Sequence, residues 1–583
     1  MDYEVIKKSS IEEMKVKPNL TNYEEMRDSF IWDKIRSELD GLPGGGFNKA
    51  YESIDRHCNT NRRDKIAFYW VSKDGNEEKY TFNDMRIETN KFASVLKELG
   101  VEKGDRVFLF LGRIPELYFT LFGILKVGAI AGPLFSAFGH EAIKDRLQDS
   151  GAKVLITSPQ LIDKIDIIRK DLPDLRHIII INREGVKYEL KEGEVSYEDA
   201  IRFAPDEFEI VQTTEEDFSI MHYTSGTTGK PKGAAHLHRA IIGQYATAKY
   251  ALDLQEADIY WCTADPGWVT GTSYGMFGPW SNGVTQLIYE GGLRADKWYS
   301  LIEEYNVSVW YTAPTVIRML MKVGEKVCRR HKLDSLRFMA SVGEPLNPEA
   351  VVWGEKAFGL PFHDNWWQTE TGCILIANYN CQDIRTGSMG RPMPGVYPTI
   401  LDDDYKNELP PGKEGHLAVK VGWPSMFKTY WNKEELYNSR FKNGWYITGD
   451  KAKKDEDGYF WFVGRADDVI NTSGHLIGPF EVESVLVEHP AVAEAGVIGI
   501  PEPMRMEVVK AFVSLIDGYS PSEELRTELK RYVQGKLSIY ACPKEIEFMD
   551  GLPKTRSGKI MRRLLKAREL GLPEGDTSTL EED

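Results

Sequence analysis

The stretch Tyr223-Thr-Ser-Gly-Thr-Thr-Gly-Lys-Pro-Lys-Gly233 places three glycines, four Ser and Thr hydroxyls and two lysines within eleven residues. Backbone N–H groups at glycine can approach an anion closely because no Cβ intervenes, while hydroxyls and lysines add hydrogen bonds and positive charge. The stretch therefore predicts a phosphate cradle, with a nucleoside triphosphate as its ligand. It differs from the P-loop, since only two residues separate Gly226 from Gly229 and a proline follows Lys230. A plain loop of turn-forming residues is the alternative interpretation.

Short apolar runs alternate with helical patterns around this stretch. Residues 105–111 are expected to form a buried strand and residues 115–127 a helix, with further buried strands at 154–157 and 177–181. Such alternation predicts an α/β fold with parallel sheets covered on both faces. The glycine-rich stretch follows an expected strand at 218–222 and precedes an expected helix at 238–252. We therefore expect it at a strand end near a helix amino terminus, where doubly wound sheets bind ligands.

Length and composition set the class of protein. A chain of 583 residues exceeds what one hydrophobic core supports, and 42% hydrophobic with 28% charged residues is typical of globular proteins. The net charge of −16 argues against a general binder of nucleic acid or membrane surfaces. The six cysteines are scattered without metal-ligand spacing, which predicts reduced thiols and neither disulfides nor structural zinc.

The sequence predicts a cytoplasmic location. The first ten residues mix acidic and basic side chains with no apolar core, unlike a secretory signal. The longest apolar stretch, 117–135, is interrupted by Lys126, three glycines and a proline. We expect a buried helix, a turn and a strand there rather than a membrane span.

A change of pattern near Gly464 predicts a domain boundary. A strand is expected at 461–463, and beyond it a helix at about 481–488, strands at 493–500 and 509–515, and a helix at 523–536. We expect a large N-terminal domain over 1–465, a hinge at 466–468 and a small α+β domain over 469–583.

Several motifs in order resemble those of the AMP-forming acyl-CoA ligases of the adenylate-forming superfamily, and among them the acetyl-CoA synthetases. Besides the glycine-rich stretch they are Gly343-Glu-Pro345, Trp366-Trp-Gln-Thr-Glu-Thr-Gly372, Tyr446-Ile-Thr-Gly-Asp450 and Leu552-Pro-Lys-Thr-Arg-Ser-Gly-Lys559. The resemblance covers about residue 47 to the end. It implies layered α/β sheets in the large domain and a small mobile C-terminal domain. It also implies two steps: a carboxylate and MgATP give an acyl-adenylate and pyrophosphate, and the thiol of coenzyme A then displaces AMP.

The resemblance implies three catalytic residues. Lys559 would stabilise the substrate carboxylate and the α-phosphate, a role that suits a compact ammonium charge. Thr369 would donate to the α-phosphate, and Glu370 would be the carboxylate associated with Mg²⁺. Catalysis would consist mostly of positioning and electrostatic stabilisation.

The resemblance also implies an ATP site on the large domain. The glycine-rich stretch would hold the β- and γ-phosphates, the strand at Gly343 and the ring of Trp366 would enclose adenine, and Asp450 would accept both ribose hydroxyls. Arg465 would reach the ribose or a phosphate. The implied ATP-binding residues are Thr224, Ser225, Gly226, Thr227, Thr228, Gly229, Lys230, Gly343, Glu344, Pro345, Asn365, Trp366, Gln368, Thr369, Asp450 and Arg465.

The acyl pocket is implied to consist of Val269, Thr270, Val342 and Trp367. In the family, a large indole at the last position closes the pocket after a methyl or ethyl group. One methylene changes binding in an apolar pocket by only about 1–3 kcal/mol, so acetate is the expected acid, with propionate as a further substrate.

The small domain is implied to rotate between the two half-reactions about Asp467, so that Gly474 replaces Lys559 near the pantetheine of coenzyme A. The chain departs from the family in that His475-Leu476 stands where an arginine is expected, and in that the short, mixed segment 158–171 lacks the Arg-rich stretch that holds the 3'-phosphate of coenzyme A in longer relatives. Gln534 likewise stands where an arginine that contacts coenzyme A is expected. The residues that hold the nucleotide of coenzyme A are therefore not identified. Some relatives are controlled by acylation of the lysine equivalent to Lys559, which implies a lysine acyltransferase and a deacylase as partners. The sequence indicates no oligomeric state.

Two other interpretations remain open. One is an AMP-forming coenzyme A ligase for another short, branched or cyclic acid, including an enzyme that works in the ATP-forming direction. The other is an adenylating module that passes its acyl group to a carrier protein, although the acetyl-type pocket argues against it. A non-catalytic nucleotide-binding regulator is disfavoured because Glu370 and Lys559 are both present.

Overall fold

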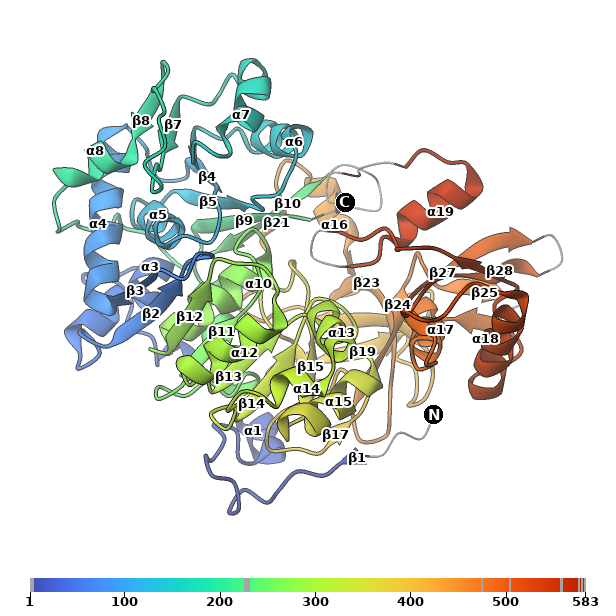
Figure 1. Ribbon diagram of the computed structural model, residues 1–583. Coiled ribbons are helices and arrows are strands. Elements are labelled where there is room, and N and C mark those ends of the chain that lie inside the picture. Colours follow the sequence, from blue (N-terminus) through green and yellow to red (C-terminus); the bar gives the residue numbers. More distant parts are fainter. Residues whose placement is uncertain are drawn as a thin grey trace.

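The computed structural model describes residues 5–224, 231–472, 475–502, 505–555 and 559–574, with Thr577 and Leu580. A large lobe of layered sheets and helices carries a small lobe on one side (Figure 1). The predicted α/β fold with a small C-terminal α+β unit is confirmed.

The first sheet of the large lobe has the strand order β21-β10-β9-β5-β4-β6-β7-β8. Its parallel part contains the strands expected from their apolar runs, and the buried helix α5 (Pro115–Lys126) precedes β5. Proline at the start of α5 and apolar residues all round it suit a buried helix. The strands are β4 (Arg106–Phe110), β5 (Ile130–Leu134), β6 (Val154–Thr157), β7 (His177–Ile180) and β8 (Glu194–Ser196).

The surroundings of the glycine-rich stretch differ in one respect from the prediction. β9 (Phe218–Thr224) precedes the stretch as expected, but the next element is β10 (Lys232–Leu237), and α9 (Ala240–Tyr250) begins only after it. β9 and β10 pair antiparallel, with Lys232 opposite Thr224 and Tyr223 opposite Gly233. The described residues on either side of the stretch thus belong to two neighbouring strands, and the next element along the chain is a strand, not the predicted helix. Lys232 and Gly233 serve as strand residues because their backbone groups complete the ladder.

The second sheet has the order β18-β16-β15-β14-β13-β11-β12-β2-β3. From β2 to β15 the strands are parallel, and antiparallel strands close both edges. The strands are β2 (Ile66–Val71), β3 (Glu77–Thr81), β11 (Ile259–Cys262), β12 (Thr285–Tyr289), β13 (Val309–Thr312), β14 (Phe338–Ser341), β15 (Phe362–Trp366), β16 (Ile376–Ala377) and β18 (Arg391–Pro392). The Gly343 motif follows β14, and the Trp366 motif spans the end of β15.

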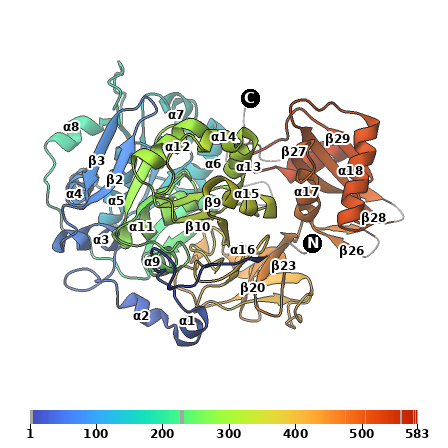
Figure 2. The ribbon, with the colours of Figure 1, turned by 60° about the horizontal axis from the view of Figure 1, so that its bottom comes forward.

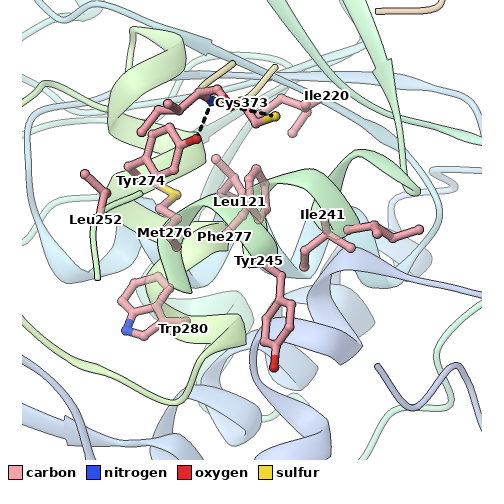
Figure 3. Packing of buried hydrophobic residues seen from close by; sticks show 14 of the residues in the cluster. Leu121, Ile220, Ile241, Tyr245, Leu252, Tyr274, Met276, Phe277, Trp280 and Cys373 are labelled. Carbon is pink, nitrogen blue, oxygen red and sulfur yellow. Dashed lines mark hydrogen bonds between the residues drawn. The ribbon is translucent and has the colours of Figure 1, made fainter. Parts of the chain in front are cut away.

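The two sheets share an apolar core. Figure 3 shows Leu121 of α5, Ile220 of β9, and Tyr274, Phe277 and Trp280 packed together, although they come from segments far apart in the sequence. The hydroxyl of Tyr274 accepts a hydrogen bond of 2.6 Å from the backbone N–H of Ile374. This bond ties the core to the segment that follows the Trp366 motif.

A third sheet joins the large lobe to the small one. It contains β19 (Pro398–Leu401), β20 (Gly415–Lys420), β22 (Phe441–Lys442), β23 (Trp445–Lys454) and β24 (Phe460–Arg465). β25 (Ile470–Thr472), the next strand, already belongs to the sheet of the small lobe. The chain thus passes between the lobes after Arg465, and the hinge at 466–468 stays a prediction.

The small lobe forms a separate body beside the large one (Figure 2). Its sheet has the order β26-β25-β28-β27, with β29 paired to β28. Helices α17 (Pro479–Val487) and α18 (Glu523–Lys536) share an apolar cluster with this sheet. The remaining elements are β26 (His475–Ile477), β27 (Val492–Glu502), β28 (Met506–Leu515), β29 (Glu545–Phe548) and α19 (Arg562–Leu570).

Candidate active site

Asp450 is the centre of a group of polar side chains from three strands. It lies on β23 opposite Arg465 of β24, whose guanidinium approaches the carboxylate to 3.1 Å. The indole N–H of Trp366 and the side-chain amide of Gln368 each donate to the same carboxylate oxygen over 3.0 Å. Burial raises the pKa of Asp450, whereas Arg465 opposes that rise. The three donors stabilise the carboxylate form, which is the form that can accept hydroxyl groups.

Glu344 lies beyond the end of β14 and is held by two side chains of α13 (Pro314–Val323). The Thr315 hydroxyl donates to one of its oxygens over 2.5 Å, and Arg318 donates to the other over 2.7 Å. The preceding Gly343 has a φ of +98°, a conformation that disfavours residues with a Cβ. The glycine therefore lets the chain turn immediately after the strand.

Glu370 is oriented by residues outside the motifs that predicted it. Tyr430 of β21 (Thr429–Tyr430) donates a hydrogen bond of 2.6 Å to its carboxylate. The backbone N–H of Phe427 donates to the Glu370 carbonyl, and a ring nitrogen of His236 lies 2.8 Å from the Thr369 carbonyl. Sequence reasoning missed all three, and nothing in their local pattern would have identified them.

Two further cations lie near Tyr430 and were not among the predicted site residues. The Lys232 ammonium lies 5.6 Å from the centre of the Tyr430 ring. Burial lowers the pKa of Lys232, the charge of Arg440 lowers it further, and Glu370 opposes the shift. Arg440, the second cation, acts on the pKa of Tyr430, and its buried Nε has no hydrogen-bond partner among the described residues, which suits a site for an anionic ligand. Lys232 lies within the glycine-rich stretch 223–233, so the sequence of that stretch could have identified it as a site residue.

Lys559 of the small lobe faces the part of the large lobe that carries Glu344. Desolvation by the surrounding protein lowers its pKa, and the positive charges of Arg465 and Arg562 act in the same direction. The negative charges of Glu344 and Asp450 act in the opposite direction. Lys559 is exposed to solvent and lines a small cavity with Glu344. The tertiary structure thus brings together residues that are more than 200 positions apart.

Trp367 is fixed by two tyrosines. Its indole N–H lies 3.3 Å from the Tyr311 hydroxyl, and its ring meets that of Tyr274 edge to face at 5.1 Å. Tyr274 comes one helical turn after Thr270, since α10 (Val269–Thr272) continues into a π-helical turn at Ser273–Phe277. Short π-helical turns are frequent at functional sites. Val342, which follows β14, is buried.

The side chain of Asn365 forms hydrogen bonds within the protein, next to the residues that hold Trp367. Its amide accepts from the Tyr311 hydroxyl over 2.9 Å and donates to the Ser341 carbonyl over 2.8 Å. Because Tyr311 also holds Trp367, Asn365 stabilises the position of the indole. A direct contact of Asn365 with ATP stays a prediction.

The other predicted residues are located as follows. Thr224 ends β9, Pro345 lines the cavity with Lys559, and the Asp467 carboxylate lies 3.6 Å from the Arg465 guanidinium. Ser225, Gly226, Thr227, Thr228, Gly229, Lys230 and Gly474 lie outside the described residues. Gln534 is on α18, and no residue described here identifies the site for the nucleotide of coenzyme A.

The described residues also bear on metal binding and on membrane spans. Across the described residues, no group of three or more His, Cys, Asp and Glu side chains is arranged to hold a metal ion. In the same part of the chain, no helix has the length and apolar character needed to cross a membrane.

The chain is similar to known proteins over most of its length. The family model described as AMP-binding enzyme matches residues 54–431, and the one described as AMP-binding enzyme C-terminal domain matches residues 481–559. The acetyl-coenzyme A synthetase of Bacillus subtilis is 53% identical over 567 residues, covering 97% of this chain and 98% of that protein. The acetyl-coenzyme A synthetase of Methanothrix thermoacetophila is 42% identical over 562 residues, covering 92% of this chain and 85% of that protein.

Solved structures show the same fold. The acyl-CoA synthetase of Brucella canis superposes with a TM-score of 0.74 at 37% identity, covering 95% of this chain and 99% of that one. The anthranilate CoA ligase AuaEII in complex with anthranoyl-AMP superposes with a TM-score of 0.82 at 33% identity, covering 91% and 98%.

Proposed function

The chain belongs to the AMP-binding enzyme family, and on that premise we propose that it uses ATP to convert acetate to acetyl-adenylate and then transfers the acetyl group to coenzyme A. AMP and pyrophosphate are released. One observation carries the proposal: Lys559 of the small lobe lines the same cavity as Glu344 and Pro345 of the large lobe. The 53% identity to an acetyl-coenzyme A synthetase over nearly the whole of both chains supports acetate as the acid.

In the first half-reaction an acetate oxygen attacks the α-phosphorus of ATP and pyrophosphate leaves. Asp450 accepts the ribose hydroxyls, because its carboxylate is held ready by Trp366 and Arg465. Lys559 donates hydrogen bonds to acetate and to the α-phosphate. Both groups are anions, so its positive charge offsets their repulsion as they approach each other. Thr369, whose carbonyl is bonded to His236, donates its hydroxyl to the α-phosphate.

The residues fit Mg²⁺ as the ion that accompanies ATP. This ion is usually held by one or two carboxylates together with substrate phosphates, not by a cage made only of protein groups. Glu370 matches that pattern, because Tyr430 occupies one of its oxygens and the described residues contain no larger metal-binding group. When bound, Mg²⁺ would offset the charge of the β- and γ-phosphates, which the residues of the stretch 224–230 would also contact.

In the second half-reaction the thiol of coenzyme A attacks the acetyl carbonyl and AMP leaves. Domain alternation predicts that the small lobe turns about Asp467, withdraws Lys559 and brings Gly474 toward the pantetheine arm. The gap between the two matched family regions, 432–480, contains the proposed hinge and supports it. Lys559 is also where a lysine acyltransferase and a deacylase would act, since its acylation removes the charge that adenylation needs.

The acid is selected by the size of the acyl pocket. Trp367 is held from two directions by Tyr311 and Tyr274, so its indole forms a fixed limit to chain length. Propionate adds one methylene, a difference of about 1–3 kcal/mol that permits slower turnover. The similarity to an anthranilate CoA ligase keeps cyclic acids as the second candidate, with synthesis of ATP from acetyl-CoA as a reversal of the same chemistry.

A panel of acids tests this function. Release of AMP is measured with ATP, Mg²⁺ and coenzyme A for acetate, propionate, butyrate, isobutyrate and benzoate. We expect the highest kcat/KM for acetate and the next for propionate. Activity only with a larger or cyclic acid would favour the second candidate. Acyl-adenylate formation without thioester release by free coenzyme A would favour a carrier-dependent module. The absence of transmembrane helices among the described residues is compatible with the proposed cytoplasmic location.

A further inference from the structure

Asn347 is the N-cap residue of α15 (Pro348–Phe358), yet its side chain does not cap that helix. Asparagine at this position normally accepts a hydrogen bond from a backbone N–H of the first turn. Asn22 and Asn48 do so at the starts of α1 (Tyr23–Ser29) and α3 (Lys49–Ser53). The side chain of Asn347 is therefore used elsewhere, although its own helix would benefit from it.

Asn347 instead reaches across to the small lobe. Its amide N–H donates a hydrogen bond of 2.8 Å to the hydroxyl of Ser484, which lies on α17. Both residues are only 5% exposed, so the bond is shielded from water and costs more to lose than a surface bond. It is a direct, buried polar link between the two lobes.

The residues on both sides of this bond contact side chains that lie close to Glu344 and Lys559. On the large lobe, Arg318 donates a hydrogen bond of 3.3 Å to the side-chain amide oxygen of Asn347 and another of 2.7 Å to Glu344. On the small lobe, Glu483 precedes Ser484 and accepts a hydrogen bond of 2.7 Å from Arg562, three residues after Lys559. Arg318 and Asn347 of the large lobe and Glu483 and Arg562 of the small lobe line the same cavity as Lys559.

We propose that the hydrogen bond between Asn347 and Ser484 is a latch that positions Lys559 for adenylation. While the lobes are docked, the amide N–H of Asn347 donates to Ser484 across the interface. When the small lobe moves away, this bond is lost, whereas the bond from Arg318 to the Asn347 side-chain oxygen lies within the large lobe. Asn347 and Ser484 act through Lys559 and are positioning residues, not catalytic ones. The inference that the latch affects one half-reaction only rests on the proposed function.

Two variants separate the latch from simple capping. Ser484→Ala removes the acceptor on the small lobe. Asn347→Ser keeps a residue that caps a helix well but is too short to reach α17. Asn22→Ala is the matched control, because it removes an N-cap far from the lobe interface.

The first measurement needs no substrate. Hydrogen–deuterium exchange of the unliganded full-length protein is followed by mass spectrometry for peptides covering 479–487 and 348–358. Loss of the latch should accelerate exchange in 479–487 in both latch variants, with no greater effect in the double variant. Asn22→Ala should leave both segments unchanged. Unchanged exchange in 479–487, or additive effects of the two substitutions, would overturn the latch.

The second measurement separates the half-reactions. In single turnover, acetyl-adenylate formation should slow about five- to tenfold in each latch variant, the range expected for a lost buried hydrogen bond. Conversion of supplied acetyl-adenylate and coenzyme A to acetyl-CoA should be unchanged. Equal slowing of both half-reactions would overturn the positioning role. If the wild-type protein forms no acyl-adenylate from any acid, the proposed function fails, whereas the exchange experiment still tests the latch.

Discussion

The hydroxyl of Tyr430 donates a hydrogen bond of 2.6 Å to the carboxylate of Glu370, from a strand 60 residues further along the chain. This bond fixes the orientation of the one carboxylate assigned to the metal. Burial raises the pKa of Tyr430, and the charge of Glu370 raises it further, so the phenol keeps its proton and remains a donor.

Tyr430→Phe should therefore weaken the metal-dependent step without unfolding the protein. A hydrogen bond to a charged group contributes about 1.5–3 kcal/mol, so we expect at least a tenfold loss in the rate of acetyl-adenylate formation and a higher Mg²⁺ concentration for half-maximal rate. The measurement is single-turnover adenylation over a Mg²⁺ titration. Tyr437→Phe is the control, because Tyr437 packs in the same aromatic cluster at 5.0 Å from Phe427. Equal behaviour of the two variants would contradict this role of Tyr430.

Asp450→Asn should act mainly on ATP binding. The amide cannot accept from Trp366, Gln368 and Arg465 as the carboxylate does, so the side chain turns and loses its ribose contact. We expect the KM for ATP to rise by about 100-fold, as for removal of a charged hydrogen-bonding partner worth up to about 3 kcal/mol. The KM for acetate should change little. A variant with an unaltered KM for ATP would show that Asp450 does not bind the nucleotide.

Lys559→Ala should abolish one half-reaction and spare the other. Adenylation needs an ammonium beside the two reacting anions, whereas thioester formation does not. We expect acetyl-adenylate formation to fall by about 1,000-fold, within the range for loss of one electrostatic stabiliser. Supplied acetyl-adenylate should still be converted to acetyl-CoA. Equal loss in both assays would contradict the assignment of Lys559 to the first step alone.

The lowered pKa of Lys559 predicts a particular pH dependence. Adenylation requires the protonated amine, so the rate should be full below the pKa of Lys559 and decline as the pH rises through it. Because desolvation by the surrounding protein and the charges of Arg465 and Arg562 lower that pKa, the decline should begin at a lower pH than for an ordinary lysine. Lys559→Arg keeps its charge at all accessible pH values and should lose this alkaline decline while retaining weak activity. The same decline in both proteins would assign it to another group.

Trp367→Gly should lengthen the acyl pocket. Removing the indole opens the space between Tyr274 and Tyr311, so butyrate and longer acids should be activated and acetate should bind less well. The ratio of kcat/KM for butyrate to that for acetate should rise by at least tenfold, equivalent to about 1.4 kcal/mol. Tyr311→Phe keeps the indole but removes its hydroxyl partner, and should shift the ratio far less. An unchanged ratio in Trp367→Gly would show that the indole does not limit chain length.

Local patterns in the sequence predicted the strands and helices well where burial was complete. The apolar runs of β4, β6 and β7 and the buried helix α5 were found within a few residues. A side chain buried on all sides leaves a continuous apolar signal that needs no knowledge of neighbours. β10 was missed because its residues Lys232–Leu237 include lysine, glycine and histidine, and they form a strand through pairing with β9. That pairing is tertiary information.

The same division applies to the site. Trp366, Asp450 and Lys559 were predicted for the site because each lies within a short motif that resembles one of the family. Tyr430, His236 and the pair Asn347–Ser484 were not, because each acts through one contact with a residue distant in sequence.

The sequence by itself determined the family, the layered α/β architecture and the residue types of the site, because these are written in local periodicity and contiguous motifs. Only the tertiary structure decided which carboxylate is held by which donor, and where the small lobe docks. Those facts depend on distances between segments that the order of residues along the chain does not specify.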